Sequence, residues 1–301
     1  MPELPGITVY VERLGARTIG NRLQRIRIIS PFLLRTAQPP LEESFDRKVS
    51  SISRIGKRIV IGLEGDYYLV IHLMVTGRLR WRDGGAKPPR KGGLAAFEFS
   101  TGTLLFTEAG IKHRASLHLV QGDRSLDQFH KGGIEVLESD DSAFIRAMRA
   151  ENHTVKRALT DPRIISGVGN TFSDEILHAT RMSPYRQTKS MSDEELVALF
   201  EKCRLVLDEW TKKLREEVGE GFPEKVSAFK EGMAVHGRFQ KPCPVCNSPV
   251  QRIRYTNNES NYCPNCQTGG KLLADRALSR LLKDDWPKTI EELERLQSGV
   301  T

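Results

Sequence analysis

The sequence lacks any long hydrophobic run. Its longest apolar stretches, such as Tyr67–His72, are far shorter than the roughly 20 apolar residues that a membrane-spanning helix requires. The N-terminal sequence Met-Pro-Glu-Leu-Pro-Gly has no basic start followed by an apolar segment, which argues against a secretory signal peptide. Internal repeats and low-complexity tracts are also absent. These absences predict a cytoplasmic protein without membrane contact, and 301 residues predict about two domains.

Cysteine is scarce and unevenly distributed. The chain has five cysteines, of which four lie between Cys243 and Cys266 and one, Cys203, lies in a helical stretch. Clustered cysteines in a cytoplasmic chain indicate a metal site rather than disulfides. We predict that Cys203 is a small, buried apolar residue.

The chain has fewer acidic than basic residues. The formal net charge is +8 and the isoelectric point is about 9.3, a balance that attracts polyanions, of which nucleic acid is the commonest. Six basic residues lie between Arg78 and Lys91, where Asp83 is the only acid. This run fits either a nucleic-acid contact or the solvated tip of a hairpin.

The first 130 or so residues have the pattern of β-structure. Short alternating or apolar runs follow one another between Gly- and Asp-containing turns, which is typical of a sandwich or barrel. Thr8–Ala16 is the exception and is predicted to be a helix. The predicted strands are Gln24–Ile29, Arg58–Leu63, Tyr67–His72, Leu94–Phe99 and Thr103–Phe106.

The hydrophobic period becomes helical from about Ser142. Ser192 and Glu195 form a capping box before the last and longest helical run. From Gly232 onward the chain becomes a turn-rich module that carries the cysteines. The predicted helices are Ala143–Met148, Val155–Leu159, Asn170–Ala179 and Leu196–Leu214.

The four clustered cysteines have the spacing of a zinc ribbon. Cys243-Pro-Val-Cys246 and Cys263-Pro-Asn-Cys266 are separated by sixteen residues, a length that suits a β-hairpin between two knuckles. Two such pairs complete a tetrahedron of thiolates and leave no open position, so we expect one structural Zn²⁺. Ribbons of this kind support nucleic-acid contacts in some proteins and protein contacts in others.

The N-terminus carries a possible nucleophile. Removal of Met1 would leave Pro2 with a free secondary amine, which can attack the anomeric carbon of a nucleoside and form an iminium ion. The neighbouring carboxylate of Glu3 can move protons for sugar ring opening. Taken alone, these residues also fit an N-terminal extension that has no chemical role.

Short motifs in a fixed order make the chain resemble the formamidopyrimidine-DNA glycosylase/endonuclease VIII family over about residues 2–267. The resemblance implies an α+β architecture with an N-terminal β-sandwich, a helical domain with a helix–two-turns–helix motif, and a C-terminal zinc-ribbon β-hairpin. The motifs are Pro2-Glu3-Leu4-Pro5, Gly56-Lys57, His72-Leu73 with Thr76-Gly77, Gly167-Val168-Gly169-Asn170 with Asp174-Glu175, and Tyr262-Cys263.

The sequence pattern, together with the resemblance, predicts domain limits. These are a catalytic β-sandwich over residues 1–134, a helical domain over 135–232, a zinc ribbon with a C-terminal helix over 233–286, and a tail over 287–301. An amphipathic helix is expected over Gly270–Trp286, either packed on the ribbon or binding a partner.

The resemblance further implies roles for single residues. Pro2 matches the nucleophile, Glu3 the general acid/base, and Glu175 a glutamate that supports the nucleophile, although it would otherwise be a helix-surface carboxylate. Lys57 and Asn170 match residues that contact DNA phosphate, and His72 is expected beside them. Damaged duplex or abasic-site DNA would be the partner, with the nucleotide flipped out because the stacked duplex shields its anomeric carbon.

Several positions depart from the family pattern. A second acid is missing at Gly6, and Val75 stands where a void-filling methionine is usual, unless Met74 takes that role. The segment Glu108–Arg114 lacks the usual paired arginines and phenylalanine, and Ile111 and Lys112 or His113 are the candidate replacements. Asn258 replaces an arginine that grips phosphate, which removes one cationic contact. These changes argue against assuming 8-oxoguanine as the substrate.

Three functions follow from this reading. The first is a base-excision glycosylase with abasic-site lyase activity, cytoplasmic, nucleoid-associated and monomeric. The second is a catalytically weak or inactive DNA-damage-binding protein on the same scaffold. The third is a protein-interaction module that uses the ribbon and the leucine-rich C-terminus.

Overall fold

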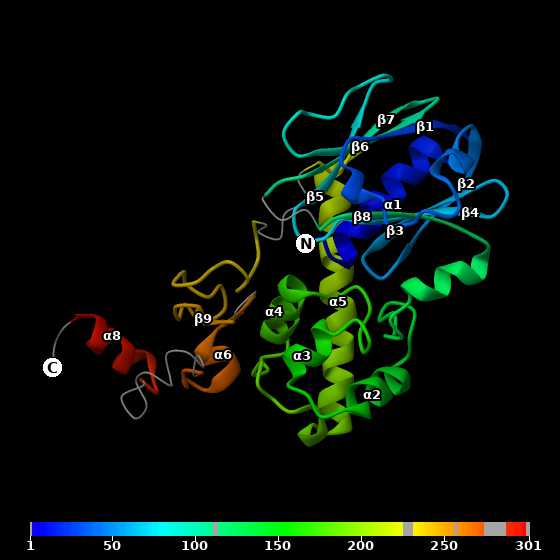
Figure 1. Cartoon of the computed structure of the whole chain (residues 1–301). Coiled ribbons are helices and arrows are strands. Elements are labelled where there is room, and N and C mark those ends of the chain that lie inside the picture. The colour runs from blue at the N-terminus through cyan, green and yellow to red at the C-terminus, as the bar shows by residue number, and fades with distance from the viewer. Residues whose placement is uncertain (1, 111–113, 225–230, 256–257, 274–286, 299–301) are drawn as a thin grey trace. The chain divides into compact units, whose positions relative to one another are not determined.

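The computed structural model describes residues 2–110, 114–224, 231–255, 258–273 and 287–298. The chain forms two compact units (Figure 1). Unit 1 contains Met1–Gly132 and Leu207–Ala228, and unit 2 contains Gly133–Val206 and Phe229–Thr301. Helix α5 (Asp193–Val218) contributes residues to both units. No helix among the described residues is long and apolar enough to cross a membrane.

Unit 1 is built on an eight-stranded antiparallel sheet with the strand order β5-β7-β6-β1-β2-β3-β4-β8. Strand β1 pairs with β6 along most of its length but with β2 at only two residues, Arg22 and Leu23. The sheet therefore divides at β1–β2 into two halves. The strands are β1 Arg22–Ile28, β2 Arg47–Ile55, β3 Arg58–Leu63, β4 Tyr67–His72, β5 Gly77–Arg82, β6 Gly93–Phe99, β7 Gly102–Glu108 and β8 Ser116–Gln121.

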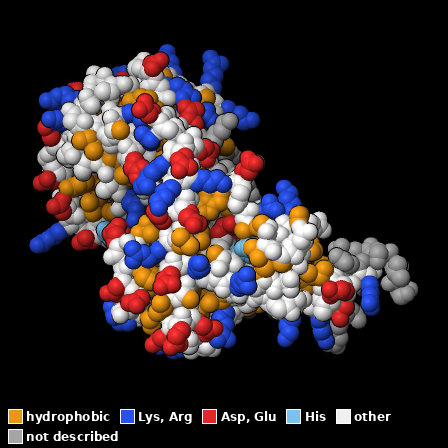
Figure 2. All heavy atoms as spheres, turned by 180° about the vertical axis from the view of Figure 1, so that it is seen from behind, with side chains coloured by type: hydrophobic (Ala, Val, Ile, Leu, Met, Phe, Trp, Pro, Cys, Tyr) orange, Lys and Arg blue, Asp and Glu red, His pale blue; other side chains and the backbone are white. Residues whose placement is uncertain are grey.

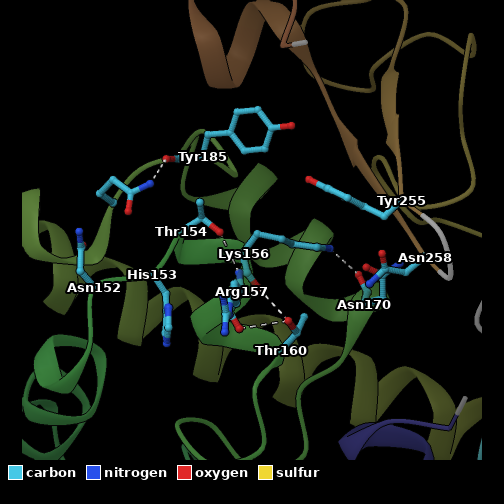
Figure 3. A pocket seen from close by; sticks show the side chains of 11 residues that line it. Asn152, His153, Thr154, Lys156, Arg157, Thr160, Asn170, Tyr185, Tyr255 and Asn258 are labelled. Carbon is cyan, nitrogen blue, oxygen red and sulfur yellow. Dashed lines mark hydrogen bonds between the residues drawn. The ribbon is translucent and has the colours of Figure 1, made fainter. Parts of the chain in front are cut away.

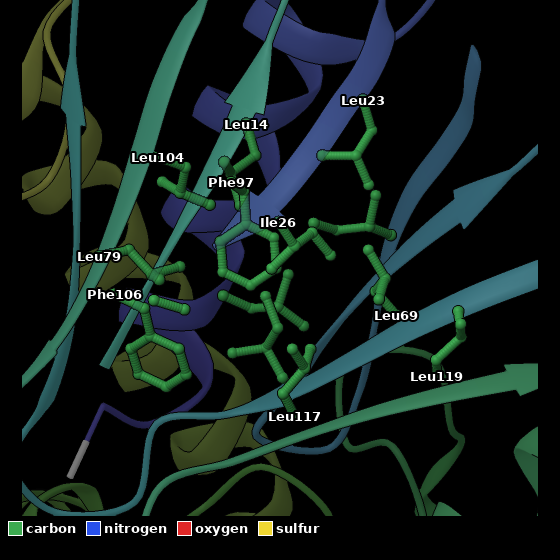
Figure 4. Packing of buried hydrophobic residues seen from close by; sticks show 14 of the residues in the cluster. Leu14, Leu23, Ile26, Leu69, Leu79, Phe97, Leu104, Phe106, Leu117 and Leu119 are labelled. Atoms are coloured by element: carbon green, nitrogen blue, oxygen red, sulfur yellow. The ribbon is translucent and has the colours of Figure 1, made fainter. Parts of the chain in front are cut away.

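The hydrophobic core of unit 1 draws on both halves of the sheet. Phe97 and Phe106 from one half and Ile71 and Leu117 from the other belong to one buried cluster, and Figure 4 shows several of its side chains converging. Helix α1 (Leu4–Thr18) adds its apolar face to the same cluster, including Tyr10. Two sheet faces that bury a common core make a sandwich, so the predicted β-sandwich is confirmed.

Unit 2 contains the three shorter helices predicted after Ser142, the first part of α5 and the cysteine module. The capping box is confirmed, because the Ser192 amide donates to Glu195 Oε2 over 2.9 Å and the Glu195 amide donates to Ser192 Oγ over 3.2 Å. The elements beside α5 are α2 Asp141–Ala150, α3 Val155–Thr160, α4 Asn170–Ala179, β9 Gln251–Arg254, β10 Glu259–Tyr262, α6 Pro264–Thr268 and α8 Ile290–Ser298. Short 3₁₀ helices occupy Pro31–Leu33, Leu41–Ser44, Asp123–Phe129 and Thr188–Ser190.

The structure tests only part of what was predicted for the C-terminal region. Most of the helix expected over Gly270–Trp286 lies outside the described residues. The segment called a tail, residues 287–298 in the described part, contains helix α8. Cys203 is fully buried on α5, as predicted.

The core cluster gives a stability prediction. Phe97 is fully buried between the sheet halves, so Phe97→Ala should lower the free energy of unfolding by about 3–5 kcal/mol through lost burial and a residual cavity. Ile29→Ala, at a side chain that is 53% exposed, should change it by about 0.5 kcal/mol. Urea unfolding followed by circular dichroism measures both, and equal losses would contradict the assigned core.

Candidate functional site

The N-terminal residues of unit 1 are buried. Pro2 is buried, and Glu3, the residue before helix α1, is only 5% exposed. Lys57 lies in the turn between β2 and β3, where burial lowers the pKa of its ammonium group and the negative charge of Glu3 opposes that shift. The turn therefore brings a cation to the carboxylate that adjoins Pro2.

His72 ends strand β4 and is paired in the sheet with Arg58. Burial lowers the pKa of His72 to about 4, and the positive charges of Arg58, Lys57 and His118 act in the same direction. The imidazole is therefore neutral at pH 7 and has one N–H to donate. Three of the residues predicted from the sequence, Glu3, Lys57 and His72, thus belong to one electrostatic cluster of unit 1.

A buried glutamate that the sequence reading did not single out anchors the loop after β7. Glu108 is 2% exposed, and its carboxylate accepts hydrogen bonds from the backbone amides of Arg114 and Ala115 at 3.1–3.3 Å. Thr76 Oγ1 also donates to it at 3.5 Å. Glu108 therefore ties this loop to the turn after β4. The candidate replacements at positions 111–113 lie outside the described residues.

The turn that links β4 to β5 exposes Val75. The Gly77 amide donates to the Leu73 carbonyl over 2.9 Å, and Met74 adopts a positive φ of 52°. A Cβ atom on Gly77 would lie 2.1 Å from the Leu73 carbonyl oxygen, so this turn requires glycine. Val75 is 59% exposed and Met74 is partly buried. Of the two, Val75 is the side chain presented to solvent.

Glu175 lies on α4 in unit 2 and is only 6% exposed. The helix-surface interpretation is therefore wrong. Its carboxylate accepts three backbone hydrogen bonds, from the amides of Ala234 at 2.7 Å, Val235 at 3.0 Å and His236 at 2.9 Å. Burial raises the pKa of Glu175, while these amides favour the ionised form. Its expected support of Pro2 stays a prediction.

The adjacent Asp174 organises a buried network that the sequence did not reveal. Its carboxylate accepts from His236 Nδ1 at 2.7 Å, Asn261 Nδ2 at 3.2 Å and Ser260 Oγ at 3.4 Å. The Lys156 ammonium group forms an ion pair with the same carboxylate and donates to the Asn170 carbonyl over 2.9 Å. Asp174 thereby joins α3, α4 and β10.

Lys156 and Asn170 from this network also line a cavity of about 740 Å³ (Figure 3). Asn170, at the start of α4, and Asn258, before β10, both line it, so unit 2 brings together two of the predicted DNA contacts. None of the lining residues is acidic. They are Asn152, His153, Thr154, Lys156, Arg157, Thr160, Asn170, Tyr185, Gln187, Tyr255 and Asn258.

The four predicted metal ligands form one cluster. The sulfur atoms of Cys243, Cys246, Cys263 and Cys266 all lie within 4.8 Å of one another, which is compact enough to hold a metal ion. The antiparallel β9–β10 hairpin lies between the two pairs, as predicted. A fifth residue, His178 on α4, is 6% exposed and places Nε2 3.2 Å from Cys243 Sγ.

Charge outside these sites is mixed. On the face drawn in Figure 2, Lys and Arg side chains are interspersed with Asp and Glu rather than gathered in one patch. Part of the basic run is in strand β5, where Arg78, Arg80 and Arg82 alternate with Leu79 and Trp81. The rest lies in the loop that joins β5 to β6.

The low pKa of His72 gives a pH prediction. Because the unfolded chain protonates this imidazole near 6.5 and the folded chain only near 4, the unfolded state binds more protons between these values. His72 should therefore cost stability as pH falls from about 6.5 to about 4, and His72→Gln should lose less stability than the wild type over that window. Urea unfolding at both ends of the window tests this, and an imidazole resonance of His72 that titrates near 6.5 would contradict it.

Comparisons with known proteins match both units. A model of the formamidopyrimidine-DNA glycosylase N-terminal domain matches residues 1–109, and a model of the formamidopyrimidine-DNA glycosylase H2TH domain matches residues 134–216. The formamidopyrimidine-DNA glycosylase of Thermus thermophilus is 30% identical over 280 residues, which cover 90% of this chain and 100% of the relative. An uncharacterized formamidopyrimidine-DNA glycosylase-like protein of Mycobacterium tuberculosis is 41% identical over 129 residues, 43% of this chain and 80% of the relative.

The fold is also similar to that of solved structures. The structure of Lactococcus lactis Fpg in complex with DNA that contains an abasic site superposes with a TM-score of 0.78 at 23% identity, covering 88% of this chain and 99% of that chain. The identity and coverage of the Thermus relative, together with the two matched domains, decide the family. The chain belongs to the formamidopyrimidine-DNA glycosylase/endonuclease VIII family of DNA repair glycosylases.

Proposed function

We propose that the protein is a base-excision DNA glycosylase with abasic-site lyase activity and that Pro2 is its nucleophile. After removal of Met1, the secondary amine of Pro2 attacks C1′ of a damaged nucleotide flipped out of the duplex. The N–C1′ bond forms as the bond to the base breaks, and the base leaves with a proton. Protonation of O4′ then opens the sugar ring, and the iminium ion forms between Pro2 and C1′.

The iminium ion makes strand cleavage accessible. It acidifies the hydrogens on C2′, so loss of one of these protons drives out the 3′-phosphate by β-elimination. Hydrolysis of the resulting conjugated iminium returns the Pro2 amine. Glu3 adjoins the nucleophile and would protonate O4′ and later accept a proton.

The observation that carries this proposal is the burial of Pro2 and Glu3, together with the charge interaction between Glu3 and the Lys57 ammonium group. A buried carboxylate next to a cation can hold and release a proton at a fixed place, which an exposed N-terminal extension would not achieve. Lys57 also carries the charge that would bind a phosphate beside the flipped nucleotide. The neutral His72 would add an N–H donor to that phosphate site.

DNA is the partner that we propose. Structures of the Lactococcus lactis relative hold DNA with an abasic site, and one holds DNA with an oxidized pyrimidine. In this chain, Asn170 and Asn258 would contact the DNA backbone through their amide groups. The departures at Gly6, Val75 and Asn258 concern substrate recognition. The base that the protein excises therefore has to be identified with a panel of DNA lesions.

We also propose one structural Zn²⁺ at the four cysteines. Four thiolates within 4.8 Å match the ligand set and the closed coordination of structural zinc. Bound there, the ion would fix the β9–β10 hairpin that carries Tyr255 and Asn258. His178 would donate its Nε2–H to the Cys243 thiolate and so link the ion to α4.

The chemistry predicts a covalent complex that borohydride can trap. Incubation with an abasic-site duplex and borohydride should cross-link the wild-type protein, because reduction of the iminium ion gives a stable amine. Pro2→Gly should reduce the cross-linked fraction strongly, and Glu3→Gln should slow turnover. Denaturing gel electrophoresis measures the cross-link, and mass spectrometry of the intact protein establishes that Met1 has been removed.

The matched control is Pro5→Gly, a change of the same kind in the first turn of α1. It should fold and still cross-link. An undiminished cross-link in Pro2→Gly would show that the secondary amine of proline is not required, because the glycine variant keeps a primary N-terminal amine that can also form a reducible imine. No cross-link in the wild type, with salt-sensitive DNA binding intact, would favour the non-catalytic DNA-binding protein, a function that fits the missing charge at Asn258.

The link between His178 and Cys243 predicts slower metal loss in the wild type than in a variant without the donor. His178→Leu should release zinc to a chelator about tenfold faster, and His178→Gln, which keeps an N–H group, should lie between the two. A zinc-sensitive dye measures the release. Equal rates in all three proteins would show that the contact does not affect the metal.

A further inference from the structure

The cavity of unit 2 has the size and the lining of a nucleotide site. Its volume of about 740 Å³ lies in the range of pockets that bind small molecules. Lys156, Arg157 and His153 line it together with three asparagines, and no acidic side chain does. Such a lining suits a ligand that combines negative charge with hydrogen-bonding edges. All the lining residues belong to unit 2, so the cavity includes neither Pro2 nor Glu3.

Two tyrosines give the cavity its aromatic character. Tyr185 lies in the loop after α4, and Tyr255 follows strand β9 and is 42% exposed. Figure 3 shows the two side chains coming from different elements and pointing into the space between them. Aromatic side chains that face an open polar cavity are the usual platforms for nucleic-acid bases, since every base has a π-face.

Both tyrosines are held by backbone hydrogen bonds. The loop of Tyr185 is fastened to the start of α3, because the Val155 amide donates to the Arg186 carbonyl over 2.7 Å. The Tyr255 amide donates to the Asn258 carbonyl over 2.8 Å. Hydrogen bonds therefore hold the backbone next to both tyrosines, which reduces the ordering that binding would require.

The polar floor offers partners for a phosphate. The Arg157 side chain is exposed on α3, and no ion pair joins it to an acid within the described part of the chain. Asn170 lines the same cavity and is the first residue of α4, where the helix dipole favours negative charge. Lys156 is already paired with Asp174, so Arg157 is the cation available to a ligand.

We propose that this cavity binds an unpaired nucleotide of the DNA strand, separate from the nucleotide attacked by Pro2. The base would stack on Tyr185 and Tyr255, and its phosphate would meet Arg157 and Asn170. A base in an intact duplex is already stacked on both faces and cannot enter, so the site selects single-stranded segments such as gaps, bubbles or overhangs. This inference rests on the proposed function only in that the protein binds DNA.

Binding to matched DNAs tests the proposal. Fluorescence anisotropy with the full zinc-loaded protein would compare an abasic-analogue duplex with the same duplex carrying a short adjacent thymidine gap. We expect the wild type to prefer the gapped DNA by roughly tenfold, the contribution of about one stacked base. Tyr255→Leu and Tyr185→Leu should remove most of this preference and leave duplex binding unchanged. Tyr255→Phe and Tyr185→Phe keep the rings and should retain it.

A second readout reports stacking directly. The fluorescence of a 2-aminopurine placed in the gap should be quenched by the wild type and by the Phe variants but not by the Leu variants. Equal wild-type affinity for gapped and continuous DNA would overturn the proposal. So would a loss in the Leu variants that is equal on both DNAs, because that result would indicate a general backbone contact.

The chemistry at Pro2 is tested separately. Borohydride trapping on the continuous abasic duplex does not require an unpaired nucleotide. Trapping without a tyrosine-dependent preference would overturn the cavity proposal and leave the proposed enzyme intact. A tyrosine-dependent preference without trapping would support the cavity and remove the lyase.

Discussion

Two adjacent buried carboxylates, Asp174 and Glu175, hold unit 2 together. Both lie on α4, and both accept hydrogen bonds from segments that follow α5 in the chain, Ala234–His236 in one case and Ser260 and Asn261 in the other. A buried charge is tolerated only when it is fully paired and hydrogen-bonded. Removing any partner would leave part of that charge uncompensated, so the cysteine module is fixed on α4 by a network that tolerates little change.

Everything that unit 2 presents to a ligand depends on this attachment. Asn170 begins the helix that carries the two carboxylates, and Tyr255 and Asn258 lie on the hairpin that the network holds. The same helix brings His178 to Cys243. The cysteine cluster, the cavity and the two predicted DNA contacts of unit 2 are therefore linked by one polar core. Helix α4 carries a cavity-lining residue, Asn170, at its first position and a residue in contact with Cys243, His178, near its last.

Burial has a different effect on the charged groups of unit 1. In unit 2, buried charges are paired with hydrogen-bonding partners, whereas around Glu3 burial lowers the pKa values of neighbouring basic groups. It lowers the pKa of Lys57 and makes His72 neutral at pH 7. A cation, a neutral donor and the carboxylate next to Pro2 thus interact through their charges in one cluster. That difference suits a site whose protons must move.

Local patterns predicted the local features of this molecule. Strands β3 and β4 and helix α4 have the predicted bounds, and the capping box and the cysteine cluster are as expected, because a few neighbouring residues determine each. Strands β2, β5 and β8 were missed. In β5, arginines alternate with Leu79 and Trp81, which is a strand pattern, but the segment was interpreted only as a run of basic residues. Burial of Glu175, the hub at Asp174 and the loop anchor at Glu108 were missed because their partners lie elsewhere in the chain.

If Asn258 stands where the family has a phosphate-binding arginine, as the resemblance predicts, this has a consequence for how the protein would hold DNA. One cation fewer means that about one counterion fewer is released on binding, so affinity should depend less steeply on salt. Stacking on Tyr185 and Tyr255 would add affinity from the same cavity, and stacking is largely insensitive to salt. The protein would thus lose a phosphate contact that any DNA backbone can make. It would gain a stacking contact that only an unstacked base can make. Its selectivity would therefore lie in the state of the strand as well as in the damaged base.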